Sequence, residues 1–189
     1  MKKYILSIAL CAIAMCSFAQ EHLTFKGIPI TGSMTTFCQK LRAKGFTQIG
    51  KEGNATLFTG DFTGRKATVG AVAADNGKDV FTVAVFFDES ESWNTLVNTY
   101  DYYKDLYIEK YGEPKQCVEK NPSIDDSNIS LMAEVHQGTV TYGSVFETKG
   151  GKIRLSIEKG TGIYTGFVLI KYQDAQNIEA KRKSDLDDI

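Results

Sequence analysis

Three stretches of this chain have an apolar residue at every second position, which is typical of β-strands with one buried face. The stretches span residues 67–73, 81–87 and 153–157. Strands of this kind are typical of antiparallel sheets that have one face on a core and the other toward water. The stretch at 153–157 is the clearest of the three and belongs to a strand expected at 152–159. Weaker strand signals, bounded by turn residues, occur at 23–30, 56–58, 62–64, 115–118, 139–148 and 166–174.

Two other segments have the helical period instead. Met34, Phe37, Cys38 and Leu41 form one apolar stripe after Ser33, and Gly45 is placed to end that helix. The second helix is expected between Ser92 and Gly112-Glu113-Pro114. Its apolar stripe consists of Trp93, Leu96, Val97, Tyr100, Tyr103, Tyr107 and Tyr111. A stripe of this type usually packs in a core, whereas Tyr102 lies off it and is expected to face solvent or a partner.

The connections are predicted from turn chemistry. Gly27 shifts the alternation by one residue, which indicates a bulge or bend in a single short strand. A three-residue loop at 75–77 would place the small residues of 67–73 opposite Phe81, Val83 and Val85. Residues 119–130 have no periodicity and are predicted to form a polar loop.

The order of helix, three strands, helix and four strands suggests one structural unit used twice. We therefore expect an α+β domain over residues 20–174, with units at about 23–88 and 92–174. The two antiparallel halves would form one curved sheet with two helices on one face. Residues 175–189 are expected to be a charged tail, frayed or loosely helical.

Two local motifs carry a resemblance to other proteins. Tyr111-Gly112-Glu113-Pro114, which closes an aromatic helix, and the opening segment 25–30 resemble small exported proteins of Gram-negative gut bacteria. The doubled helix-plus-sheet order resembles the β-lactamase inhibitor protein family, whose two units form one curved sheet that grips a partner. That family has a disulfide in each unit, whereas this chain has a single cysteine in each. The resemblance implies no particular binding residue.

The N-terminus is typical of an exported protein. Two lysines precede an apolar run from Tyr4 to Met15, and Ser17-Phe18-Ala19 forms a cleavage signal. We expect residues 1–19 to be a signal peptide, and the product to be periplasmic or secreted. Lipidation at Cys16 is the alternative, although the preceding Met15 is bulkier than such sites usually allow.

Composition argues against a nucleic-acid partner and against membrane insertion. Without Lys2 and Lys3, the chain has 20 Lys and Arg against 23 Asp and Glu, a net charge of −3. This balance argues against a nucleic-acid partner. After the leader, no run approaches the roughly 20 apolar residues of a membrane span, so no membrane insertion is expected.

Catalytic motifs are lacking in the sequence. His22 and His136 lie near no nucleophile signature, Asp125-Asp126 lacks the pattern of a calcium loop, and no sequence motif indicates a cofactor. The sequence therefore favours a non-catalytic binding or envelope-accessory protein. The alternative is a secreted hydrolase whose residues come from scattered positions.

Cys38 and Cys117 are the two cysteines that follow the leader. In an oxidising compartment they could form a disulfide that closes a long loop. Two buried free thiols are the equally weighted alternative.

A binding surface is expected on the sheet face opposite the helices. Alternation places Arg154, Ser156 and Glu158 on that face, and Lys171 on the next strand is expected to join them. Their mixed charges suit a protein or glycan partner better than a lipid surface. The alternative is an ordinary solvated strand face.

Overall fold

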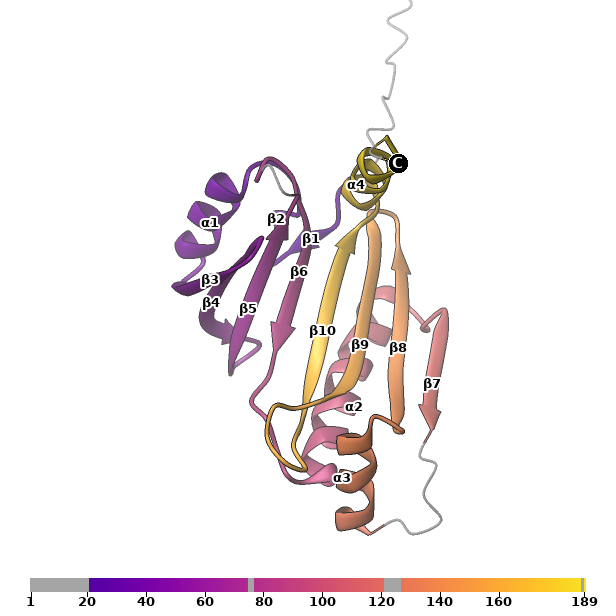
Figure 1. Ribbon diagram of the computed structural model, residues 1–189. Helices are drawn as coiled ribbons and strands as arrows, with labels where there is room; N and C mark the ends of the chain where they lie inside the picture. The colour runs from indigo at the N-terminus through magenta and orange to yellow at the C-terminus, as the bar shows by residue number, and fades with distance from the viewer. Residues whose placement is uncertain (1–20, 75–76, 121–126, 188) are drawn as a thin grey trace, which may run out of the picture.

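The computed structural model describes residues 21–74, 77–120, 127–187 and 189 (Figure 1). The expected signal peptide at 1–19 lies outside these residues. The described part is α+β and contains four helices, an eight-stranded antiparallel sheet and a two-stranded sheet. This agrees with the expected fold class and its antiparallel sheet.

The strands are β1 (Thr24–Phe25), β2 (Ile28–Pro29), β3 (Thr47–Glu52), β4 (Ala55–Phe62), β5 (Arg65–Ala73), β6 (Val80–Phe86), β7 (Gln116–Lys120), β8 (Thr141–Thr148), β9 (Gly151–Lys159) and β10 (Gly166–Asp174). The helices are α1 (Met34–Ala43), α2 (Trp93–Tyr111), α3 (Asn128–Gln137) and α4 (Ala175–Asp187).

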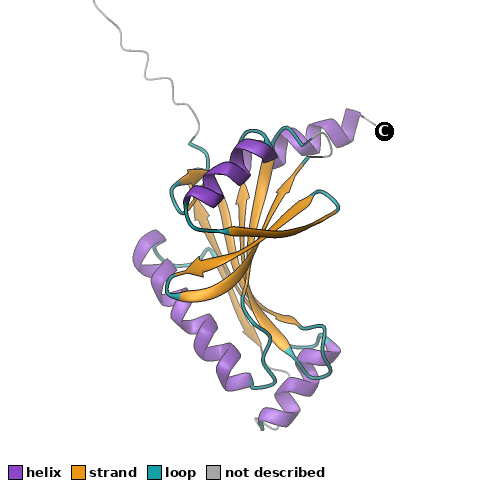
Figure 2. Ribbon diagram, turned by 90° about the vertical axis from the view of Figure 1, so that its left-hand side faces the viewer, coloured by secondary structure: helices purple, strands orange, loops and turns teal. Residues whose placement is uncertain are grey.

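The large sheet has the strand order β3-β4-β5-β6-β10-β9-β8-β7. The first half of the chain supplies β3 to β6 and the second half supplies β7 to β10, and the halves meet where β6 pairs with β10. Figure 2 shows the twist of this sheet from its side, as expected for strands of L-residues.

One face of the large sheet holds the hydrophobic core. Val69 pairs with Val85, Val85 with Ile170, and Ile170 with Leu155, and all four are fully buried. Side chains of α1, α2 and α3 belong to the same buried cluster. We call this side the closed face and the opposite side the open face.

Helix α2 confirms the expected aromatic stripe. Ser92 caps its N-terminus by accepting a hydrogen bond from the Thr95 backbone N–H, and Gly112 ends it with a φ of 83°. The stripe residues Trp93, Leu96, Tyr100, Tyr103 and Tyr107 are buried, whereas Val97 and Tyr111 are partly buried.

Helix α3 corrects the expectation of a polar loop that extends to residue 130. The helix begins after Ser127, whose side chain accepts from the Ser130 N–H, and ends at Gly138 in the left-handed region. It packs on the closed face through Leu131, Met132 and Val135. A third helix therefore joins the two that were expected there.

Two details of the strands also differ from expectation. Gly27 forms no bulge, because it and Lys26 form the turn of the antiparallel β1–β2 hairpin. Val69 and Ala71 lie opposite Val85 and Val83 as expected, but a register shift after Val72 pairs Ala73 with Val80. Val80 is therefore buried, and Phe81 lies only half-buried on the open face. The expected loop at 75–77 falls partly outside the described residues.

The C-terminal segment forms a helix, α4, which agrees with the helical alternative expected for the tail and not with the frayed one. It begins directly after β10, where Asp174 Oδ1 accepts from the Asn177 N–H at 3.0 Å. Asn177 in turn donates to the carbonyls of Ile30 and Val80. These bonds hold the first turn of α4 against the sheet, although none of its described side chains is buried.

Candidate functional site

The open face brings together the four charged and polar strand residues expected there. Arg154 on β9 lies directly opposite Lys171 on β10, and Ser156 and Glu158 follow on the same side of β9. Arg154 and Glu158 form an ion pair at 3.6 Å, with side chains 56% and 37% exposed. In Figure 1 the strands β9 and β10 pass in front of α2, so this view looks onto the open face.

Ser156 lies on this face but is not accessible. Its residue is 1% exposed, and its hydroxyl donates to Glu158 Oε1 at 2.6 Å. A serine is too short to rise above the neighbouring side chains on a pleated surface. Ser156 therefore orients Glu158 and is not itself a contact residue.

The sequence pattern did not indicate that the open face is also apolar. The rings of Phe86 and Phe167 lie 6.0 Å apart between centroids with an angle of 43°, and Leu169 pairs with Phe86 across the strands, two residues before Lys171 on β10. These side chains are half-buried, although none of the described helices covers them. The small residues Gly70 and Ala84 lie opposite each other on β5 and β6, so the surface there is recessed relative to the larger side chains around it.

A cavity of about 310 Å³ lies in this low part of the open face. Its lining includes Val72, Phe81, Phe86, Leu169 and Lys171. Thr82 also lines it, and its buried Oγ1 has no hydrogen-bond partner among the described residues. A buried hydroxyl without a partner is unusual in a folded protein, and a bound ligand or water would satisfy it.

Tyr102 is exposed as expected but does not join the open face. It lies on α2, which packs on the closed side, where its ring contacts Tyr103 and the guanidinium of Arg65. The five expected site residues therefore divide into four on one face and Tyr102 on the other.

Both cysteines are free in the structure. Cys38 is buried on α1, which packs near β5, whereas Cys117 is exposed on β7 at the far edge of the sheet. The structure therefore has the free-thiol alternative and not the disulfide, although only Cys38 is buried.

Polar groups surround Cys117. Its thiol donates to Glu119 Oε1 at 3.3 Å and accepts from Ser144 Oγ at 3.5 Å, and Glu119 forms an ion pair with Lys104 at 2.5 Å. Burial acts to raise the pKa of Glu119, but the hydrogen bonds from Lys104 and Cys117 outweigh it and hold that pKa below its usual range.

We expect the two thiols to differ in accessibility. In the protein cleaved after Ala19, iodoacetamide should alkylate one thiol under native conditions and both in denaturant, because Cys38 is exposed only on unfolding. Intact mass spectrometry measures the number of adducts. The Cys117→Ser variant should take up no label when folded. Two unreactive thiols that appear only after reduction would contradict the arrangement.

A carboxylate fastens the loop between β9 and β10. Glu89 accepts from the Thr165 hydroxyl at 2.6 Å, from the Thr161 hydroxyl at 2.8 Å and from the Thr161 N–H at 2.9 Å. These bonds, that from Thr165 first, lower the pKa of Glu89 to about 2. The loop thereby holds Ile163 and Tyr164 in exposed positions.

No group of three or more His, Cys, Asp or Glu side chains in the described part of the chain is arranged to hold a metal ion. None of the described helices combines the length and apolar character needed to cross a membrane.

Comparisons with protein families, with curated protein sequences and with solved structures found no match to this chain.

Proposed function

We propose that this chain is an exported, non-catalytic binding protein that holds a partner protein against the open face of its sheet. The observation that carries the proposal is that half-buried apolar side chains lie beside charged ones on a face left uncovered by the helices that the structure describes. Phe86, Phe167 and Leu169 form the apolar part, and Arg154 and Lys171 lie beside it.

The composition of this surface supports a protein partner. Protein interfaces are enriched in aromatic residues at the centre and have a charged rim. Arg154 is already paired with Glu158, whereas Lys171 has no ion-pair partner among the described residues. We therefore propose a partner segment that places an apolar side chain beside Leu169 and a carboxylate beside Lys171.

The order of the strands supports a finer description of the fold. We propose that 23–88 and 92–174 are tandem units whose halves form one curved sheet, with the open face as its binding side. The sheet divides between β6 and β10 into a half from each part of the chain, as this proposal requires. A partner-binding role of this kind is what the resemblance to the β-lactamase inhibitor protein family implies, whereas the resemblance to exported gut-bacterial proteins implies export alone.

The proposal is tested by photo-crosslinking in the organism that makes the protein. A p-benzoylphenylalanine placed at Phe167 should give an adduct with a partner protein, and the same residue placed at Tyr102 should give none. Tyr102 is the matched control because it is aromatic and exposed but lies on the closed side.

The intact mass of the recovered protein should also correspond to a chain that starts at Gln20, and a diacylated Cys16 would contradict the cleavage.

Affinity for the identified partner then tests the contacts. Exchanging the charges in the double variant Arg154→Glu/Glu158→Arg should weaken binding about tenfold while the fold is retained, since neither side chain is buried. An adduct from position 102 alone, or an unchanged affinity, would overturn the proposed face.

A further inference from the structure

A second concave site lies on the other side of the molecule, between α2 and two hairpin turns. It is a cavity of about 550 Å³, within the usual size range of small-molecule sites. Its lining combines aromatic rings with two lysines: Phe62, Tyr103, Tyr107, Tyr111 and Tyr172, with Lys26 and Lys110. Thr24, Gly27, Thr63, Leu106 and Glu109 complete it.

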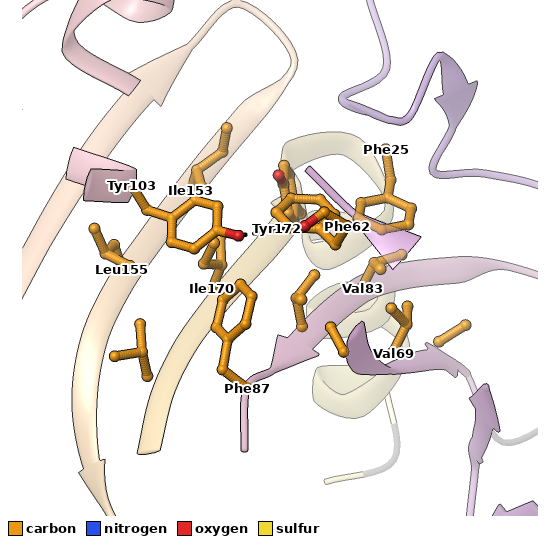
Figure 3. Close-up of a cluster of buried hydrophobic side chains, with 14 of the residues drawn as sticks. Phe25, Phe62, Val69, Val83, Phe87, Tyr103, Ile153, Leu155, Ile170 and Tyr172 are labelled. Carbon is orange, nitrogen blue, oxygen red and sulfur yellow. Dashed lines mark hydrogen bonds between the residues drawn. The ribbon is translucent and has the colours of Figure 1, made fainter. Parts of the chain in front are cut away.

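Aromatic rings form part of the wall of this cavity and continue behind it. Phe25 and Phe62 stack at 5.7 Å with an angle of 2° between the rings, and Tyr107 and Tyr111 stack at 5.7 Å. Figure 3 shows Phe25, Phe62, Tyr103 and Tyr172 converging from different elements. Rings held in this way favour the flat or hydrocarbon part of a ligand.

Two of the tyrosines that line the cavity hydrogen-bond to each other. The phenol oxygens of Tyr107 and Tyr172 bond to each other, and this bond uses only one of their two protons. No other acceptor in the described part of the chain contacts either hydroxyl. Burial raises the pKa of both phenols, so they stay neutral and do not repel an anion.

The ionised groups of the lining give it a net positive charge. Lys26 and Lys110 are exposed cations, and Glu109 is the single carboxylate among the lining residues. Lys26 donates one hydrogen bond to the Asp61 carbonyl at 2.9 Å, and its Nζ lies over the ring of Phe46 at 5.3 Å, so two of its N–H bonds have no hydrogen-bond acceptor among the described residues. Lys110 lies over the ring of Tyr111.

The two turns at this cavity have residues that their geometry disfavours. Lys26-Gly27 and Thr63-Gly64 are two-residue hairpin loops in which both residues have positive φ, as in type I′ turns. Asn, Asp or Gly is preferred at the first position, where φ is 49° for Lys26 and 54° for Thr63. Both disfavoured side chains line the same cavity, a pattern typical of sites where function sets the residue.

We propose that this cavity, which we call the tyrosine pocket, binds a small apolar carboxylate. The hydrocarbon body of the ligand lies against the rings of Phe62, Tyr107 and Tyr111. Its carboxylate lies at the mouth, where it accepts from the ammonium groups of Lys26 and Lys110. This site is separate from the open face and does not depend on it.

Isothermal titration of the purified protein with 2-naphthoate tests the proposal. We expect one molecule bound per chain, and at least about tenfold weaker binding of the neutral, equally shaped 2-naphthamide. Decanoate is the second probe, because a tighter fit of decanoate would assign the pocket to alkyl rather than aryl carboxylates. Equal affinity for 2-naphthoate and 2-naphthamide would overturn the proposal. So would the absence of a heat of binding for both 2-naphthoate and decanoate at concentrations up to about 5 mM.

Variants connect the binding to this pocket. The double variant Lys26→Gln/Lys110→Gln should weaken 2-naphthoate binding about tenfold, and Thr24→Trp should block the mouth from an exposed position. The matched control, Lys51→Gln/Lys159→Gln, removes the same charge from exposed strand positions outside the pocket and should change the affinity less than about twofold. An equal loss in the control would show general charge attraction and contradict the site.

Lys26→Asn separates binding from folding. Asparagine suits the first position of a type I′ turn, so we expect the thermal midpoint to be unchanged or raised while 2-naphthoate binding weakens several-fold. A lower midpoint with unchanged affinity would mean that Lys26 serves only the fold.

Discussion

Replacing Asp174 with alanine is expected to lower the free energy of unfolding by about 2–4 kcal/mol. The carboxylate is fully buried, and its Oδ2 accepts from the Leu23 N–H at 2.8 Å and lies 3.1 Å from His22 Nδ1. Its Oδ1 accepts from the Asn177 N–H at the start of α4. Alanine would leave the Leu23 N–H buried without an acceptor and would remove the cap of α4, and these two losses together account for the expected magnitude.

Urea unfolding followed by Trp93 fluorescence measures this effect, because Trp93 is the single tryptophan and is buried against Tyr142. The free energy of unfolding should fall less in Asp174→Asn than in Asp174→Ala, since the asparagine amide oxygen can still accept one hydrogen bond. Asp185→Ala, which removes an exposed carboxylate from the same helix, should cost less than about 0.5 kcal/mol. A Asp174→Ala variant as stable as Asp185→Ala would show that the N-terminal segment and α4 are not joined through this side chain.

Phe25→Ala is expected to destabilise the protein by about 3–5 kcal/mol. Phe25 is fully buried, and its ring lies against Phe62, against Tyr172 at 5.3 Å and against Phe46 at 6.1 Å. Truncation would leave a cavity where the small β1–β2 hairpin meets the large sheet. Because surrounding rings cannot collapse fully into such a space, the loss of transfer free energy is increased by a cavity term.

Phe86→Ala is the matched comparison on the open face. Its ring is half-buried and has one aromatic neighbour at 6.0 Å, so the same truncation should cost only about 1–1.5 kcal/mol. Thermal and urea unfolding of both variants measure the difference. Equal losses would mean that the open face is packed as tightly as the closed one, which would contradict its assignment as a free binding surface.

Local pattern predicted most of the regular elements. The helical stripes begin after Ser33 and Ser92 as expected, because a cap and a 3.6-residue period depend on neighbouring residues only. Helix α3 was not predicted from the sequence, although Ser127 and Gly138 are residue types typical of the N-cap and C-cap of a helix. A helix of ten residues is marginal by itself, and its stability comes from packing, including the bond from the Trp93 N–H to Asn128.

The candidate sites were predictable only in part. Alternation placed Arg154, Glu158 and Lys171 on one face, because side chains two residues apart on a strand point the same way. It could not show that Phe86 would lie beside Phe167, since they come from strands 81 residues apart whose pairing is non-local.

The sequence by itself determined the helices that follow Ser33 and Ser92, the half-buried strands and the polar strand faces, because period, caps and turn residues act within a few positions. Only the tertiary structure decided that β6 pairs with β10, that Gly27 turns a hairpin, and that Lys26, Thr63 and Tyr172 line one pocket. Those choices depend on contacts between distant segments, where many pairings bury similar apolar area. Complete packing of one closed face selects among them.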